Sequence, residues 1–144
     1  MKVSRWILSA LVLIGVACPA AGVVSASTHP KGCRRQWVEH RIKNYSKSPK
    51  GMPRYRFLSE TAVYVATSGC TALGPDTVET LSRMVLSDEG YVRFWSATIL
   101  SNLGRSAIPA RRRLIQASAI YKNETGSVRS IDAIELALSN IPNK

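Results

Sequence analysis

Cysteine and histidine are the side chains of this chain with the widest chemical repertoire, as metal ligands, nucleophiles and proton carriers. The chain has three cysteines and two histidines: Cys18, Cys33, Cys70, His29 and His40. Neither histidine has a partner at the spacing of a metal site or a catalytic triad, and Gly-x-Ser-x-Gly, Cys-x-x-Cys and phosphate-loop motifs are absent from the sequence. The sequence therefore predicts no catalytic residue, no metal site and no cofactor, and we expect a protein that is not an enzyme.

Cys18 belongs to an N-terminal segment with the three parts of a secretory signal peptide. Lys2 and Arg5 supply the positive start, residues 6–16 form an apolar run, and the small residues 24–26 precede a cleavage position. The apolar run is shorter than the ~20 residues that cross a bilayer, which argues against a transmembrane anchor. We expect residues 1–26 to be removed, which leaves residues 27–144 as one small domain in the periplasm or outside the cell.

Removal of the leader changes the cysteine count to an even pair, Cys33 and Cys70. Such a pair in an oxidising compartment predicts one disulfide, worth roughly 3–4 kcal/mol of stability in the chain-entropy model. Two alternatives stay open. Cys33 and Cys70 are free thiols in one, and Cys18 is the acylated first residue of a lipoprotein in the other, although Gly15 stands where a bulky aliphatic residue is expected.

Positive charge is concentrated near the start of the expected mature chain. The whole chain carries a net charge of +11, and residues 31–56 hold nine basic side chains against one acidic side chain, Glu39. A region of this kind favours anionic lipid, an envelope polymer, nucleic acid or an acidic protein face, and Arg34, Arg35 and Arg41 are candidate contacts. Aromatic residues interleave with these charges, but we expect them to pack in the core, and we expect no nucleic acid partner for an exported protein.

Apolar spacing predicts helices along the whole mature chain and no strand. Periodic stripes and turn residues place them over residues 33–46, 57–67, 77–87, 91–103, 106–121 and 128–141. The predicted fold class is therefore all-α. The predicted organisation is a signal peptide (1–26), a basic segment with a cap helix (27–56) and a helical repeat domain (57–144).

Two of these helices begin alike. Tyr91-Val92-Arg93 and Ser127-Val128-Arg129 are 36 residues apart, and each comes after an amphipathic helix and a polar turn. Paired helices at such a period are typical of an α-solenoid. Residues 74–104 resemble a HEAT repeat of the phycobilisome-lyase type at Asp88, Val92, Arg93, Ala97, Leu100, Leu103 and Gly104. A second copy matches at Pro109, Leu114, Val128, Arg129, Ala133 and Leu136.

The resemblance covers residues 71–141 and implies a short α-solenoid of about two helix pairs behind an N-terminal helical cap, which a Cys33–Cys70 bond would pin to the repeats. It also implies a binding scaffold whose partners lie on the second helices of the pairs. In this family, an arginine at the position of Arg93 and Arg129 ties one repeat to the next through an acidic residue. Phe94 is expected on the exposed surface, and Trp95 between repeats.

A further basic group, Arg111-Arg112-Arg113, falls within a predicted helix whose apolar side leaves Arg112 and Arg113 pointing outward. These two side chains form either a solvated face or a second contact for an acidic partner.

The leading hypothesis is an exported, non-enzymatic HEAT-like adaptor that binds another protein in the periplasm or outside the cell, for example as an inhibitor or immunity protein. The alternative is a binder of anionic envelope polymers through residues 31–56. An enzyme is the third class, and it requires an acid–base pair that the fold brings together in a cleft.

Overall fold

The computed structural model describes residues 32–124, 126 and 128–143, so the expected signal peptide lies outside the described residues. The described α-helices are α1 (Arg35–Asn44), α2 (Met52–Ser68), α3 (Pro75–Met84), α4 (Gly90–Leu103), α5 (Arg111–Tyr121) and α6 (Val128–Asn140). Two 3-10 helices, η1 (Tyr45–Lys47) and η2 (Gly104–Ala110), come directly after α1 and α4. The all-α prediction is confirmed for the described residues, and none of these helices is long and apolar enough to cross a bilayer.

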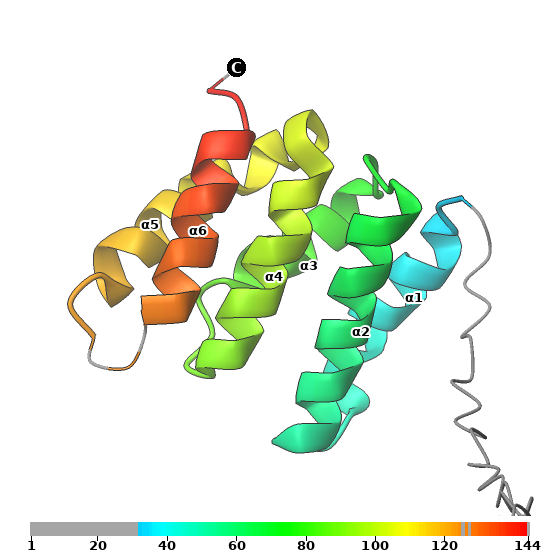
Figure 1. The fold of residues 1–144 in the computed structure, drawn as a ribbon, viewed down its shortest axis with the longest axis horizontal. Helices are drawn as coiled ribbons and strands as arrows, with labels where there is room; N and C mark the ends of the chain where they lie inside the picture. The colour runs from blue at the N-terminus through cyan, green and yellow to red at the C-terminus, as the bar shows by residue number, and fades with distance from the viewer. Residues whose placement is uncertain (1–31, 125, 127, 144) are drawn as a thin grey trace, which may run out of the picture.

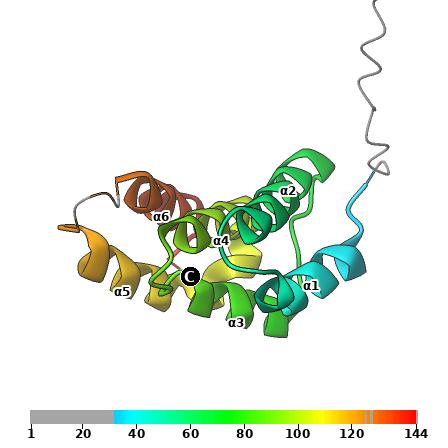
Figure 2. The same cartoon turned by 90° about the horizontal axis from the view of Figure 1, so that it is seen from below.

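The helices form two layers, which are seen end-on in Figure 2. One layer contains α1, α3 and α5, and the other contains α2, α4 and α6, with neighbours in each layer in contact. Figure 2 shows α4 set below α2 and α6, so the second layer is slightly concave. Because successive helices also pack on one another, three helix pairs lie side by side: α1–α2, α3–α4 and α5–α6.

The segment expected as a cap therefore occupies the place of a first helix pair. The helices predicted to form the two pairs, α3 with α4 and α5 with α6, are in contact, and their arrangement as a solenoid stays a prediction. The prediction of two pairs plus a cap is incomplete for α1–α2, which packs on α3–α4 through both layers. The membership of these pairs in the HEAT family stays a prediction.

Two helix bounds differ from the expected ones because of proline. Helix α2 begins at Met52 rather than at residue 57, with Pro53 in its first turn. Proline is tolerated there because the backbone N–H groups of the first turn have no hydrogen-bond partner within the helix, so the missing N–H costs nothing. The expected boundary after residue 56 therefore falls inside α2. The helix predicted over residues 106–121 is split, because Pro109 lies in the 3-10 segment η2 and α5 begins only at Arg111.

Helix α4 is the centre of the core, since it packs against α2, α3, α6 and η2. Val92, Ser96, Ile99 and Leu100 are fully buried along it. The spacing of three and four residues between them places all four on the sides that face other helices. What remains of α4 is one narrow exposed stripe.

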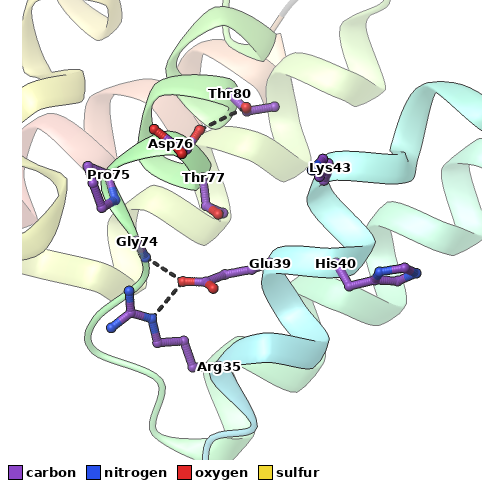
Figure 3. Close-up of a pocket in the computed structure, with 9 residues that line it drawn as sticks. All are labelled: Arg35, Glu39, His40, Lys43, Gly74, Pro75, Asp76, Thr77 and Thr80. Carbon is purple, nitrogen blue, oxygen red and sulfur yellow. Dashed lines mark hydrogen bonds and ion pairs between the residues drawn. The ribbon is translucent and has the colours of Figure 1, made fainter.

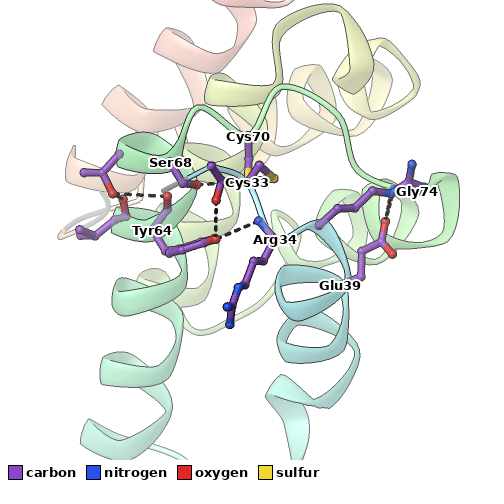
Figure 4. Close-up of a disulfide and its surroundings, with 11 residues drawn as sticks. Cys33, Arg34, Glu39, Tyr64, Ser68, Cys70 and Gly74 are labelled. Atoms are coloured by element: carbon purple, nitrogen blue, oxygen red, sulfur yellow. Dashed lines mark hydrogen bonds and ion pairs between the residues drawn. A yellow bond between two sulfur atoms is a disulfide. The ribbon is translucent and has the colours of Figure 1, made fainter. Parts of the chain in front are cut away.

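The predicted disulfide between Cys33 and Cys70 is confirmed, with 4.9 Å between the two Cα atoms (Figure 4). Cys33 precedes α1 and Cys70 comes after α2, so the bond closes the first helix pair upon itself rather than joining a cap to the repeats. Beside it, the Tyr64 hydroxyl accepts a hydrogen bond from the Arg34 N–H at 2.9 Å and donates one to the Gly32 carbonyl at 3.1 Å.

A carboxylate makes the connection from the first pair to the second. Glu39 on α1 accepts a hydrogen bond from the Gly74 N–H at 2.5 Å, at the start of α3 (Figure 3). A Cβ atom at position 74 would lie only 2.9 Å from Glu39 Oε1 and 3.0 Å from an Arg35 nitrogen. A larger residue at position 74 would have to displace the ends of these two side chains, so glycine suits the close approach of Glu39.

Candidate functional site

Four aromatic side chains meet on the concave layer, where α2 and α4 lie side by side. Tyr55 of α2 lies 6.1 Å from Tyr91 and 5.8 Å from Trp95, measured between ring centroids. Phe94 and Trp95 of α4 contact each other at 4.6 Å, edge to face. We call Tyr55, Tyr91, Phe94 and Trp95 the aromatic cluster.

The aromatic cluster occupies the exposed stripe of α4. Tyr91, Phe94, Trp95 and Thr98 are spaced by at most four residues, and all four are only partly buried because the other sides of α4 face neighbouring helices. The expected exposure of Phe94 is therefore partial. Trp95 of α4 lies against Tyr55 of α2, and its expected position between repeats stays a prediction.

A groove of about 290 Å³ runs from the aromatic cluster towards α6. Its lining residues are Tyr55, Gly90, Tyr91, Phe94, Gly126, Arg129 and Ser130. Arg129 is exposed and, within the described residues, forms no ion pair. The groove therefore combines aromatic walls with one open guanidinium, an arrangement suited to an apolar group that carries a carboxylate nearby.

The Trp95 indole N–H is a hydrogen-bond donor within the aromatic cluster. Its indole N–H is buried and, within the part of the chain described, has no hydrogen-bond acceptor. Buried tryptophan nitrogens normally find a partner, because an unpaired donor costs free energy.

The Tyr91 end of the groove is held by hydrogen bonds. The Tyr91 hydroxyl donates to Glu89, which also pairs with Arg54 of α2 at 3.0 Å. The same hydroxyl accepts a hydrogen bond from the Gly51 N–H at 3.4 Å. Burial, together with the bond to Glu89, raises the pKa of Tyr91 above its ordinary value, so the phenol stays neutral.

Arg93 makes the kind of tie between repeats that is expected of it. Its side chain is 3% exposed, pairs with Glu124 at 2.9 Å and lies 3.8 Å above the Tyr121 ring. It also donates to the Ser87 and Asp88 carbonyls. These contacts join α4 to the end of α5, that is, the second pair to the third.

Arg129 is the counterpart of Arg93 in the sequence repeat, but the structural role expected for it is wrong. Its side chain lies at the groove, and the described residues offer it no carboxylate. The physical reason is its position in the array, because no helix pair comes after α6 in the described chain to supply the acid.

The basic candidates at the N-terminal end divide by what their side chains contact. Arg34 is exposed, and Arg35 pairs with Glu39 at 2.6 Å, a hydrogen bond that lowers the pKa of Glu39. Arg41 donates to the Thr61 hydroxyl and the Phe57 carbonyl, both at 2.8 Å, and lies 4.0 Å from the Phe57 ring. Arg41 therefore holds α1 against α2, and only 18% of its side chain is exposed.

Arg112 and Arg113 also separate. Arg112 is exposed, as expected, but the outward orientation expected for Arg113 is wrong. Arg113 reaches α3, where its guanidinium lies 2.5 Å from both Glu79 and the Ser82 hydroxyl. Hydrogen bonds from Arg113 and then from Arg83 lower the pKa of Glu79 to about 2.

Titratable side chains also surround a cleft of about 460 Å³ between α1 and the start of α3 (Figure 3). Glu39 is already bonded to Arg35 and Gly74 there, and His40 Nε2 faces the Asn44 amide at 3.4 Å. Within the described residues, no three His, Cys, Asp or Glu side chains are grouped so as to hold a metal ion.

Sequence reasoning finds Phe94 but misses Tyr55, Tyr91 and Arg129 as parts of the same site. The sequence contains one indication of the site. Tyr91 and Phe94 lie on the side of α4 that its buried apolar residues do not occupy. The contact of Tyr55 with that side depends on how α2 packs beside α4, which the spacing within either helix does not specify.

Comparison with known proteins finds no family model, no curated protein and no solved structure that matches this chain. The geometry and chemistry of the site are therefore the basis for assigning a function.

Proposed function

We propose that this chain is an exported, non-enzymatic HEAT-like binding protein that holds another protein on its α2–α4–α6 layer. The observation that carries the proposal is the aromatic cluster with its adjoining groove. Aromatic and arginine side chains are the types most enriched among residues that dominate protein interfaces. Here three aromatic rings of α2 and α4 line one groove together with Arg129 of α6, which has no ion pair in the described part of the chain.

The arrangement of the rings supports binding rather than mere packing. Tyr55 contacts both Tyr91 and Trp95, and Tyr91 is fixed by Glu89 and Gly51, so the groove wall is ordered before a partner arrives. An ordered wall loses little side-chain entropy on binding. The partner chemistry that fits is an apolar side chain next to an aspartate, glutamate or terminal carboxylate, because Arg129 supplies the complementary charge.

The compartment is part of the same proposal. A leader of the signal-peptide type and the Cys33–Cys70 disulfide both suit a periplasmic or extracellular protein. A small exported protein without chemistry of its own acts by occupying a partner, and an inhibitor or immunity protein is the specific form we favour.

The proposal is tested by capturing partners with the exported protein at physiological salt. Phe94→Ala and Arg129→Gln should each lose the partner that the unsubstituted protein captures. The matched control is Ile115→Ala, which removes an equally apolar and more exposed side chain from α5 in the other layer. If Phe94→Ala and Arg129→Gln retain every partner that the control retains, the groove is not the binding site.

The alternative, an envelope-polymer binder through residues 31–56, has less support from the contacts. Arg35 and Arg41 pair with Glu39 and Glu60, and Arg54 pairs with Glu89. Three of the basic side chains of this region therefore have their charge balanced inside the fold.

A further inference from the structure

The turn between α1 and α2 and the start of α2 carry exposed side chains for which the described residues provide no ion pair. Lys47, Lys50 and Arg56 are exposed and form no ion pair within the described residues, and Met52 lies among them in sequence. We call Lys47, Lys50, Met52 and Arg56 the basic tip. In Figure 1 this turn lies at the lower edge of the described molecule, at the lower end of α2.

Met52 gives the basic tip an apolar element. Its side chain is 62% exposed, more than any other large hydrophobic side chain described. Met52 and Arg56 also line a hollow of about 520 Å³ with Pro53, Phe57 and Glu60. Glu60 is the carboxylate in that hollow, and its charge is paired with Arg41 at 3.1 Å.

The backbone beneath the basic tip is held in place by Arg54. This side chain is 8% exposed and donates to the Ser46 carbonyl at 3.1 Å and to the Ser48 carbonyl at 2.8 Å. It also pairs with Glu89 at the start of α4. One buried arginine thus orders the turn, so the exposed cations need little further backbone ordering to meet a surface.

We propose that the basic tip docks the protein on the surface of a bilayer that contains anionic lipids. Lys47, Lys50 and Arg56 supply charge for lipid phosphates, and Met52 enters the boundary between headgroups and acyl chains. Three cations with one apolar side chain give weak, reversible and salt-sensitive binding rather than anchoring. The basic tip shares no lining residue with the groove, although the neighbouring Gly51 N–H bonds the Tyr91 hydroxyl, so the inference does not depend on the proposed function.

A bilayer is favoured over a soluble polyanion because of Met52. A polyanion needs only the cations and gains nothing from an exposed methionine, whereas an interfacial contact buries it. The two occupants therefore differ in their response to loss of Met52, which makes them separable.

The experiment is co-sedimentation of the exported protein, its N-terminus verified by mass spectrometry, with lipid vesicles. Vesicles of phosphatidylcholine alone are compared with vesicles that also contain phosphatidylglycerol. We expect binding to the second kind only, weakened about fivefold for each cation removed. Lys47→Gln, Lys50→Gln and Arg56→Gln combined should then weaken binding on the order of a hundredfold.

Two matched controls decide whether position or overall charge matters. Arg105→Gln, Arg112→Gln and Lys122→Gln remove the same charge from exposed sites on η2, on α5 and just after α5, and should retain binding. Met52→Ser should weaken vesicle binding, whereas Val63→Ser, at another exposed apolar residue of α2, should not.

Three results would overturn the inference. One is equal binding to both kinds of vesicle, and another is equal loss in the two triple variants. The third is binding of polyphosphate as tight as that of vesicles, with Met52→Ser changing neither, which would identify the basic tip as a polymer site.

Discussion

Arg93 and Arg129 occupy the same position in the sequence repeat but have opposite fates. Arg93, between the second and third helix pairs, is buried against Tyr121 and paired with Glu124. Arg129, on the last helix, opens onto a groove and has no acid within the described residues. The two equivalent arginines therefore differ in their surroundings, because Arg93 forms an ion pair within the described residues and Arg129 does not.

The first helix pair also differs from the last in how its helices are held together. It is closed by the Cys33–Cys70 bond, and Arg41 and Arg54 are used to hold its helices and turn together. The last pair has no covalent closure in the described residues.

The largest effect expected from the contrast between the first and last helix pairs is the loss of stability when the disulfide is removed. Replacing Cys33 and Cys70 by serine should lower the free energy of unfolding by roughly 3–4 kcal/mol, because the unfolded chain regains the entropy of the open loop. Denaturant unfolding with and without reductant measures this free energy. The reductant should not change the free energy of unfolding of the serine variant. Equal stability of the oxidised and reduced protein would mean that the disulfide does not stabilise the first helix pair.

A smaller effect compares the two arginines directly. Arg93→Met should cost about 2–3 kcal/mol of stability, since it removes a buried guanidinium that pairs with the half-exposed Glu124 and donates to two carbonyls. Arg129→Met should change stability by less than about 0.5 kcal/mol, as exposed substitutions do. Similar losses of stability in both variants would contradict the conclusion that Arg93 stabilises the fold and Arg129 does not.

Acid should act on the contact between α3 and α5. The pKa of Glu79 is about 2, below its ordinary value of 4.5, because Arg113 and Arg83 donate hydrogen bonds to it. Its contribution to stability is therefore complete above pH 4.5 and is lost as the pH falls towards 2. Glu79→Gln should flatten the decline in melting temperature over that range.

The matched control for the acid experiment is Glu135→Gln on α6, an exposed carboxylate with no ion pair within the described residues. Its melting curve should match that of the unsubstituted protein at each pH. An unchanged profile for Glu79→Gln would show that Arg113 does not stabilise the join between α3 and α5.

Tyr55 should matter more for binding than for stability. Tyr55→Ala removes a partly exposed ring that contacts Tyr91 and Trp95, so it should alter partner capture far more than the melting temperature. Capture assays and thermal melts on the same sample compare the two quantities. A large drop in melting temperature without loss of the partner would place Tyr55 in the core rather than in the site.

The sequence predicts the features that depend on local spacing or on counting. The Cys33–Cys70 pair is predictable from an even cysteine count, and the buried role of Arg93 from its place in the repeat motif. Arg113 and Arg41 are not predictable in this way, because helical periodicity shows which side is polar but not which polar side another helix covers. The contact of Tyr55 with Tyr91 depends on the packing of α2 beside α4, so no spacing within one helix predicts it.

The disulfide also governs how the protein would survive a protease. Lys47, Lys50 and Arg56 place trypsin-type cleavage positions between Cys33 and Cys70, at and beside an exposed turn. A cut there would leave both pieces covalently joined, with α1 still packed on α2 and α3. Such a nicked molecule would migrate as one band until it is reduced.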